Sequence, residues 1–475
     1  MFVRRAKIVC TLGPATESLD NVRALVASGM NVARLNMSHG THAEQEIRYR
    51  NVRQASDESG QAVGILADLQ GPKIRLGKFS AGKVEVKPGD RFTITTRDID
   101  GTAQSASTTY KGLPGDVKAG DRILIDDGRV AMRALEVTDT DVVCEILEGN
   151  ALSSSKGINL PGVAVSVPAL SDKDEEDLRW ALRTGVDIIA LSFVRNAKDY
   201  HDVRRIMDEE GIVVPVIAKI EKPQAVDNLQ EIVDVFDGIM VARGDLGVEL
   251  PLEEVPLVQK QCIQKARVAG KPVIVATQML DSMERASRPT RAEASDVANA
   301  VLDGADALML SGETSVGDHP FLTVQTMSRI IEHIETNALA QLPTISHEQD
   351  ADTGLVLTWA ATEIGASLNA RYLAAFTETG RSARALARHR KSTPLLAFTP
   401  NPRVRSLLSL VWGIETFLVP SVRHTDDMVE QLEAALLASG RALIGEKIVI
   451  VAGVPPGVPG STNGLRVHTM GHGKA

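Results

Sequence analysis

The chain has 475 residues, of which 43% are hydrophobic and 24% are charged, as in ordinary globular proteins. Its 52 basic and 61 acidic side chains give a formal charge of −9, and 3% of the residues are aromatic, which argues against nucleic acid as a partner. Three scattered cysteines argue against a disulfide framework, and no apolar run reaches the roughly 18 residues of a membrane span. We therefore expect a cytoplasmic protein of about three domains, with no membrane partner.

Short runs rich in Val, Ile, Leu and Ala recur along the chain, with amphipathic helical stretches between them. Such nearly continuous apolar runs are typical of parallel strands buried on both faces. Eight of them, alternating with helices, predict a (β/α)8 barrel. The runs are 7–12, 32–38, 63–69, 188–193, 214–221, 238–245, 273–278 and 307–311.

The third and fourth runs are separated by more than a hundred residues. That gap holds short strand-like runs, such as FTITTRD and DRILIDDG, between turn residues, which predicts a small all-β insert at 71–167. Ser171 then opens S-D-K-D, the pattern of a helix N-cap.

Strand–helix alternation resumes after about residue 340 and predicts a parallel α/β sheet. The predicted domains are a barrel (1–70 and 168–340), the insert (71–167) and a C-terminal α/β domain (341–475), with 341–352 as a linker. The segment 454–475, rich in Gly and Pro, is expected to be irregular, with His468 and His472 exposed.

Polar side chains end six of the predicted barrel strands. One such end is usually a cap or a surface charge, but the active site of a barrel lies where the strands end, so six together favour a functional site. The residues are Arg34, Asn36 and Ser38; Asp68; Lys219 and Glu221; Arg243 and Asp245; Thr277; Ser311 and Glu313.

These residue types favour phosphoryl transfer. Lys219 and Glu221 are two residues apart on one strand and so point to the same side. Glu221 and Asp245 offer hard oxygen ligands for one divalent cation, and Arg34 and Arg75 offer positive charge to phosphate oxygens. The sequence has no Walker-type phosphate loop and no zinc-like His/Cys spacing. The set suits a reaction catalysed by positioning and charge stabilisation.

The sequence resembles the pyruvate kinase family over essentially its whole length. The matching segments are KIVCTLGPAT, VARLNMSHG, DLQGPKIRLG, KGINLPG, SVPALSDKD, IAKIEKPQAVDN, MVARGDLGVEL, ATQMLDSM, PTRAEASDVANAVLDGADALMLSGET and TETGRSARALARHR. The resemblance implies a barrel with an inserted β lid and a C-terminal α/β domain. It also implies transfer of phosphate from phosphoenolpyruvate to ADP, giving pyruvate and ATP, in the last step of glycolysis.

The same resemblance assigns roles to the motif residues. Lys219 matches the lysine that stabilises the transferring phosphoryl group, and Arg34 matches the arginine that contacts the phosphates. Glu221 and Asp245 match the ligands of Mg2+ or Mn2+. The remaining matches are Gly244 and Thr277 for the substrate carboxylate; Asn36, Ser38, His39, Arg75 and Lys156 for the nucleotide; and Ser311 and Glu313 for a proton path to the enolate.

One departure from the family pattern concerns K+. Many members bind K+ at the positions of Asn36, Ser38, Asp68 and the carbonyl of Leu69, with Glu after the DxxGP motif. Here Lys73 follows that motif, and its ammonium group is expected to supply the positive charge that K+ otherwise brings. We therefore predict activity without K+; the alternative is that Lys73 points to solvent.

The loop TETGRS joins a predicted strand to a helix. Its hydroxyls, backbone amides and arginine are typical of an anion site, and the resemblance implies a phosphorylated allosteric effector. The residues are Thr377, Glu378, Thr379, Gly380, Arg381 and Ser382. AMP, ribose 5-phosphate and fructose 1,6-bisphosphate all stay open as effectors, and an ordinary capped turn is the alternative.

The resemblance further implies a homotetramer. Two other hypotheses stay open: a metal-dependent lyase or aldolase on the same barrel, and an inert paralogue that only binds an effector. The first would not need Lys156 or the other nucleotide residues, and the intact Arg34, Lys219, Glu221, Asp245 and Thr277 argue against the second.

Overall fold

The computed structural model describes residues 4–163, 165–345 and 352–471. Eight parallel strands close into a barrel in the order β1-β16-β15-β14-β13-β12-β3-β2, which confirms the predicted (β/α)8 fold. The strands are β1 (Lys7–Thr11), β2 (Val32–Asn36), β3 (Gly64–Asp68), β12 (Ile188–Leu191), β13 (Val216–Ile220), β14 (Gly238–Ala242), β15 (Val273–Ala276) and β16 (Ala307–Leu310).

Burial along these strands distinguishes the residues that build the barrel from those that line its rim. Six strands are buried at every position, as expected when a strand is covered on both faces. The two exceptions are β2 and β13, whose partly exposed positions are Arg34, Asn36 and Lys219. Three of the polar side chains noted in the sequence are therefore the positions at which the barrel strands are not fully buried, whereas Asp68 is buried at the end of β3.

Helices follow the barrel strands. Ser171 caps the helix after the insert, because its side chain accepts from the Asp174 N–H while the Asp174 carboxylate accepts from the Ser171 N–H, as the S-D-K-D pattern predicted. The helices are α1 (Leu19–Ser28), α2 (His42–Ser59), α4 (Asp172–Thr184), α5 (Asp199–Glu210), α6 (Pro223–Asp227), α7 (Leu229–Val235), α8 (Arg243–Glu249), α9 (Val255–Val268), η1 (Asp281–Glu284), α10 (Arg291–Asp303), α11 (Gly312–Ser315), α12 (Pro320–Asn337) and η2 (Leu339–Gln341).

The insert between β3 and α4, called the lid below, is mainly β structure with its own apolar core. One short helix, α3 (Leu113–Asp116), is a departure from the all-β prediction. Its sheets have the orders β10-β4 and β11-β7-β8-β9-β5-β6. The strands are β4 (Lys83–Glu85), β5 (Arg91–Thr95), β6 (Ser105–Ser107), β7 (Arg122–Ile125), β8 (Val130–Val137), β9 (Asp141–Glu148), β10 (Ala151–Ser153) and β11 (Ile158–Asn159).

The chain leaves the barrel for the lid at Gly71. This residue has φ +75°, and a Cβ built there would lie 2.6 Å from Phe193 Cδ2. Only glycine fits this turn without displacing the aromatic ring, so the turn holds the path into the lid against the barrel rim.

The C-terminal region forms a five-stranded sheet in the order β19-β18-β17-β20-β21. The expectation of an irregular segment after residue 454 was wrong for 462–469, because this last strand pairs antiparallel with β20 and buries His468, which contacts Glu433. Residues 454–461 form neither helix nor strand, as expected. His472 and half of the predicted linker, residues 346–351, lie outside the described residues. The elements are α13 (Thr353–Ser367), β17 (Tyr372–Phe376), α14 (Arg381–Ala387), β18 (Leu395–Thr399), α15 (Pro402–Leu408), β19 (Ile414–Leu418), α16 (Thr425–Ala438), β20 (Lys447–Gly453) and β21 (Thr462–Thr469).

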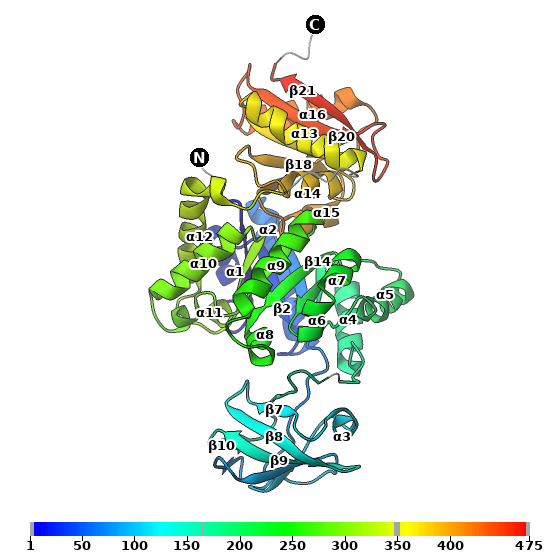
Figure 1. The fold of residues 1–475 in the computed structure, drawn as a ribbon. Coiled ribbons are helices and arrows are strands. Elements are labelled where there is room, and N and C mark those ends of the chain that lie inside the picture. Colours follow the sequence, from blue (N-terminus) through cyan, green and yellow to red (C-terminus); the bar gives the residue numbers. More distant parts are fainter. Residues whose placement is uncertain (1–3, 164, 346–351, 472–475) are drawn as a thin grey trace.

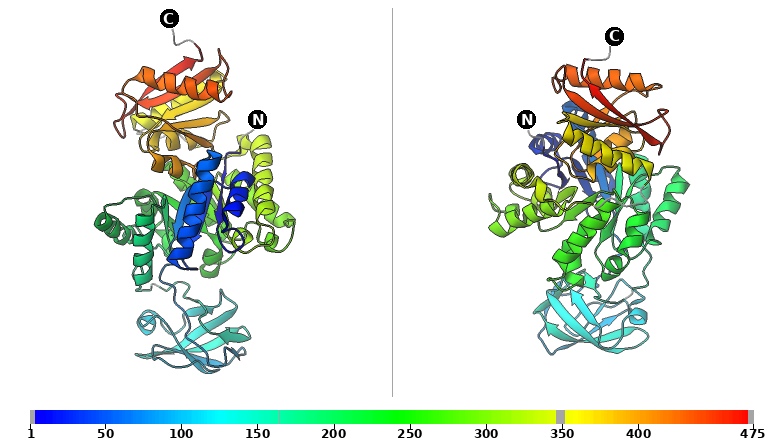
Figure 2. Two further views of the ribbon diagram at one scale, coloured as in Figure 1. Left: turned by 180° about the vertical axis from the view of Figure 1, so that it is seen from behind. Right: turned by 45° about the horizontal axis from the view of Figure 1, so that its top comes forward.

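The lid and the C-terminal sheet lie at opposite ends of the barrel (Figures 1 and 2). At the end where the strands begin, Lys7 Nζ donates to the Ile414 carbonyl at 2.8 Å, and Asp306 forms a buried ion pair with Arg390 at 2.9 Å. The lid emerges after β3, at the end where the strands finish. In the part of the chain that the structure describes, no helix is long and apolar enough to cross a bilayer.

Candidate active site

Lys219 is the centre of the polar cluster at the barrel rim. Its ammonium group lies 2.8 Å from Glu221 Oε1 and 3.3 Å from Asp68 Oδ1, and it donates to Ser192 Oγ at 2.8 Å. Burial by itself lowers the pKa of a lysine, but the carboxylates of Asp68 and Glu221 outweigh it and raise the pKa of Lys219 above its usual value. The group is therefore a fixed cation, and it does not act as a base near neutral pH.

Asp68 joins Lys219 to Arg34. Its Oδ2 accepts from Arg34 Nε at 2.7 Å, and Arg34 Nη1 donates to Thr11 Oγ1 at 3.0 Å. Burial raises the pKa of Asp68, but Lys219 and Arg34 oppose this and bring it below its usual value. Asp68 is therefore ionised, and it holds two cationic side chains side by side at the rim.

Glu221 and Asp245 are the neighbouring carboxylates. Glu221 is buried; its Oε2 accepts from the Phe193 N–H at 2.7 Å, and Asp245 lies in the first turn of α8. Burial raises the pKa of Glu221; Lys219 opposes the rise and the charge of Asp245 adds to it. Two hard oxygen donors with mutually repelling charges fit a divalent cation such as Mg2+. Among the described residues, no three or more His, Cys, Asp or Glu side chains lie together in a way that could hold a metal ion.

Gly244 and Thr277 meet at the start of α8. The Gly244 N–H donates to Thr277 Oγ1 at 2.7 Å, and Thr277 has φ +69°, an uncommon conformation for a β-branched residue. Arg243 holds this turn by donating to the Thr277 carbonyl at 2.8 Å and pairing with Asp296 at 2.7 Å. The Gly244–Asp245 pair lies in the first turn of α8, and the strained backbone of Thr277 marks this turn as a candidate binding feature.

Ser311 and Glu313 follow the last barrel strand. Both Glu313 carboxylate oxygens accept backbone hydrogen bonds, from Ser311 at 2.6 Å and Leu280 at 3.2 Å, and burial raises the pKa of Glu313. Ser311 Oγ is buried and has no hydrogen-bond partner among the residues that the structure describes. Glu313 therefore fixes the turn, and the Ser311 hydroxyl keeps its hydrogen-bonding capacity free.

The residues matched to the nucleotide are divided between the barrel and the lid. Asn36 Oδ1 accepts from the Ser38 N–H at 3.1 Å, and His39 is exposed in the following turn. In the lid, Arg75 Nη1 donates to the Ser155 carbonyl at 3.0 Å, and Lys156 pairs with Asp126 at 2.9 Å. These lid cations contact other lid residues, so the structure does not bring them onto the Lys219 cluster.

Lys73 is exposed where the lid joins the barrel. Its side chain and that of Asp245 line the same cavity, of about 290 Å³, between the lid and the barrel. Among the described residues, the cations paired with Asp68 are Arg34 and Lys219. The Leu69 carbonyl accepts from Ser192 Oγ at 2.7 Å.

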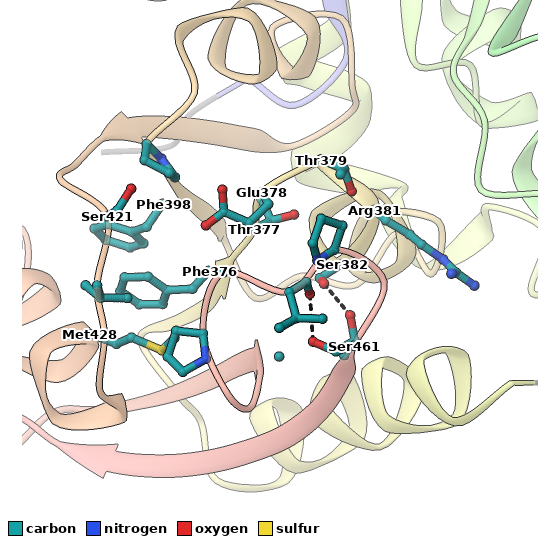
Figure 3. A pocket seen from close by; sticks show the side chains of 18 of the residues that line it. Phe376, Thr377, Glu378, Thr379, Arg381, Ser382, Phe398, Ser421, Met428 and Ser461 are labelled. Atoms are coloured by element: carbon teal, nitrogen blue, oxygen red, sulfur yellow. Dashed lines mark hydrogen bonds between the residues drawn. The ribbon is translucent and has the colours of Figure 1, made fainter.

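The loop 377–382 lines a separate pocket in the C-terminal sheet, together with residues of the segment 453–462 (Figure 3). Gly380, with φ +81°, donates to Thr377 Oγ1 at 2.9 Å, and Ser382 Oγ lies 2.6 Å from Thr462 Oγ1. The Arg381 side chain points away from the other lining residues and pairs with Asp352. The predicted strand–loop–helix arrangement is confirmed by β17 and α14.

Sequence reasoning missed two contributors to the rim cluster. Ser192 accepts from Lys219 and donates to the Leu69 carbonyl, and Phe193, with φ +54°, directs its backbone N–H at Glu221. Ser192 lies just past the end of β12, so the rule applied to the other polar strand ends would have found it. The Phe193 contact is made by the backbone N–H, so the identity of the side chain gives no sign of it in the sequence.

Comparison with known proteins gives two family matches. Residues 3–324 match the model described as pyruvate kinase, barrel domain, and residues 357–468 match that described as pyruvate kinase, alpha/beta domain. Together they span most of the chain.

Individual relatives agree with these matches. A pyruvate kinase of Mycobacterium tuberculosis is 58% identical over 470 residues, covering 99% of both chains, and one of Corynebacterium glutamicum is 57% identical over 468 residues, covering 98% of both. A crystal structure of a pyruvate kinase from Cryptosporidium parvum superposes with a TM-score of 0.92 at 37% identity, covering 98% of this chain and 96% of that one.

Proposed function

Because the chain belongs to the pyruvate kinase family, and is thus a phosphotransferase enzyme of glycolysis, we propose that the rim cluster around Lys219 transfers the phosphoryl group of phosphoenolpyruvate to ADP. One observation carries this assignment: a buried ammonium group held between two carboxylates beside a fixed guanidinium. Pyruvate formation should require both phosphoenolpyruvate and ADP. Pyruvate formed equally well without nucleotide would favour a lyase instead.

The chemistry follows from the charges at the rim. The moving phosphoryl group carries negative charge on its oxygens throughout the transfer. Lys219 and Arg34 are already oriented by Asp68, so they stabilise that charge with little reorganisation. Lys219 does not serve as a general base in this transfer, because its neighbouring carboxylates raise the pKa of its amine.

The remaining rim residues orient the substrate and complete the reaction. The Gly244 N–H and the Thr277 hydroxyl, bonded to each other in this structure, are the donors assigned to the substrate carboxylate. Glu221 and Asp245 are the residues that would hold Mg2+ or Mn2+, which neutralises charge on the phosphate and carboxylate oxygens when bound. The Ser311 hydroxyl is assigned to the proton path toward the enolate, with Glu313 holding its turn.

ADP is assigned to the space between the lid and the barrel. The barrel residues assigned to ADP are Asn36, Ser38 and His39, and the lid residues assigned to it are Arg75 and Lys156. Lid closure would carry the lid cations toward the nucleotide and exclude water, which prevents hydrolysis of the phosphoryl group. In this structure Lys156 is paired with Asp126, so closure must exchange that partner for phosphate oxygens.

Activity is expected without added K+. Lys73 lies at the cavity that Asp245 also lines, so its ammonium group brings a positive charge to the lid side of the site. Initial rates in tetramethylammonium buffer should stay within about 2-fold of those in K+, whereas Lys73→Glu should introduce a K+ requirement of about 10-fold. Lys78→Glu, an exposed lid substitution, is the charge-matched control. A strong K+ requirement in the unmodified enzyme would contradict the proposal.

A phosphorylated metabolite is proposed to regulate the enzyme through the loop 377–382. The loop offers the hydroxyls of Thr377, Thr379 and Ser382, and binding of an anion by Arg381 would require its side chain to leave Asp352. Replacing Ser382 by Ala should weaken activation by about 10-fold, equivalent to the loss of one charge-assisted hydrogen bond, and leave unactivated turnover intact. The assay is turnover at sub-saturating phosphoenolpyruvate with AMP, ribose 5-phosphate or fructose 1,6-bisphosphate. Unchanged activation in the variant by every one of these would exclude the loop as the effector site.

The domain boundaries at residues 70, 168 and 340, the homotetramer and the cytoplasmic location are also proposed for this chain. The lid's separate apolar core and the separate C-terminal sheet support the division into domains. Relatives of nearly equal length at 57% and 58% identity support a common assembly.

A further inference from the structure

Glu249, at the last position of α8, is a buried carboxylate with no assigned role. Its side chain is 1% exposed, and its Oε1 accepts from Lys222 Nζ at 2.5 Å and from Asn159 Nδ2 at 3.1 Å. Its Oε2 is buried and has no hydrogen-bond partner among the described residues. A carboxylate buried this deeply is costly unless its contacts serve the fold or the function, so its partners are informative.

Glu249 and its two partners come from three segments that meet at the rim. Asn159 lies on β11 of the lid, and Lys222 directly follows Glu221. Glu249 itself closes the helix whose first turn carries Asp245. One carboxylate oxygen therefore joins the lid to both segments that carry the proposed metal ligands.

A second contact extends the connection to Glu221. Lys222 Nζ lies 5.6 Å from the centroid of the Phe193 ring, and the backbone N–H of Phe193 donates to Glu221 Oε2 at 2.7 Å. Lys222 thus touches the residue that orients Glu221, in addition to being its neighbour in sequence. Asn159, Lys222 and Asp245 also line one cavity of about 290 Å³ between the lid and the barrel.

Other lid–barrel hydrogen bonds lack this connection. Arg195 donates to the carbonyls of Val165 and Val167 at 3.0 and 2.9 Å, and Gln224 donates to the Val163 carbonyl at 3.4 Å. These bonds hold the backbone of the segment that returns from the lid. They connect the lid to the barrel without an ion pair to the segment that carries Glu221 or to the helix that carries Asp245. Their loss therefore controls for a general loosening of the lid.

We propose that Glu249 is a positioning residue that couples the placement of the lid, through Asn159, to the placement of Glu221 and Asp245. The inference rests on the proposed function, because it takes these two carboxylates as the cation ligands. When the lid moves Asn159, Glu249 Oε1 loses or gains the hydrogen bond from Asn159 Nδ2. The ion pair with Lys222 and the position of α8 adjust in response. The position of the lid then changes the placement of the cation ligands, in addition to covering the site.

The experiment is Mn2+ titration of the full-length enzyme by electron paramagnetic resonance, without substrates. Asn159→Ala and Glu249→Gln should each weaken Mn2+ binding by about 10-fold, as expected for the loss of groups that orient metal ligands. The double variant should bind only about as weakly as the worse single variant, because both act through one oxygen. Gln224→Ala, which removes a lid–barrel bond of the other kind, should bind Mn2+ like the unmodified enzyme.

The outcomes separate this inference from the proposed function. Asp245→Asn is the reference: if it leaves Mn2+ binding intact, the proposed cation site is wrong. If it abolishes binding while Asn159→Ala and Glu249→Gln bind normally, only the coupling through Glu249 is overturned. Asn159→Ala keeps the test decisive if Glu249→Gln does not fold. Equal weakening by Gln224→Ala would also overturn the coupling, because it would show a general effect of lid loosening.

Discussion

Replacing Lys219 by methionine is expected to slow ADP-dependent pyruvate formation by about 10²–10³-fold, the usual loss when one preorganised charge-stabilising group is removed. Methionine has similar length and no charge. Asp68 keeps Arg34 as a partner, and Glu221 keeps the Phe193 N–H, so the rim stays assembled. The measurement is steady-state turnover, with phosphoenolpyruvate binding followed separately by calorimetry.

The matched control is Lys271→Met. Lys271 is also partly buried, but it lies next to the start of β15, where it donates to the carbonyls of Val233 and Asp234 at 2.6 and 2.9 Å. When the variant is fully folded, that substitution should change turnover by less than about 2-fold, because Lys271 lies at the opposite end of the barrel from the rim. Near-normal turnover in Lys219→Met would show that its ammonium group does not stabilise the transferred group.

Replacing Asp245 by asparagine, or Glu221 by glutamine, is expected to weaken Mg2+-dependent activity by at least about 100-fold at limiting metal. Each change removes one of the paired anionic oxygen donors while preserving side-chain shape. The measurement is turnover as a function of free Mg2+. Raising the Mg2+ concentration should recover part of the activity of Asp245→Asn, because that residue is only half-buried and its loss leaves Glu221 paired with Lys219.

The control for the metal variants is Asp318→Asn. Asp318 is exposed and pairs with Arg285 at 2.9 Å, away from the Lys219 cluster. The Asp318→Asn variant should need the same free Mg2+ concentration for half-maximal turnover as the unmodified enzyme. If Asp245→Asn and Glu221→Gln shared that ordinary Mg2+ dependence, these two carboxylates would not be the metal ligands.

The barrel and much of its rim were predictable because their signals are local. Strands buried on both faces leave continuous apolar runs, and a charged residue at the end of such a run, as at Asp68 or Lys219, is conspicuous. Ser192 is small and polar, so it does not interrupt the pattern in the same way. The contact from Phe193 to Glu221 depends on a left-handed backbone and not on the side chain.

Two further features depended on pairing between distant segments. The last strand, β21, follows the Gly- and Pro-rich stretch 454–461, and it is ordered as a strand by its antiparallel register with β20. The ion pair between Lys156 and Asp126 follows from how β11 pairs with β7 in the lid. The same holds for Glu249, whose importance appears only when Asn159 and Lys222 converge on it.

Transfer of the phosphoryl group from phosphoenolpyruvate to ADP by this enzyme can be followed through the fate of the phosphorus atom. Phosphorus NMR of the enzyme with phosphoenolpyruvate, ADP and Mg2+ should show the phosphoenolpyruvate signal replaced one-for-one by the γ-phosphate of ATP, with no reaction when ADP is omitted. Release of inorganic phosphate, or consumption of phosphoenolpyruvate at the same rate without ADP, would contradict it.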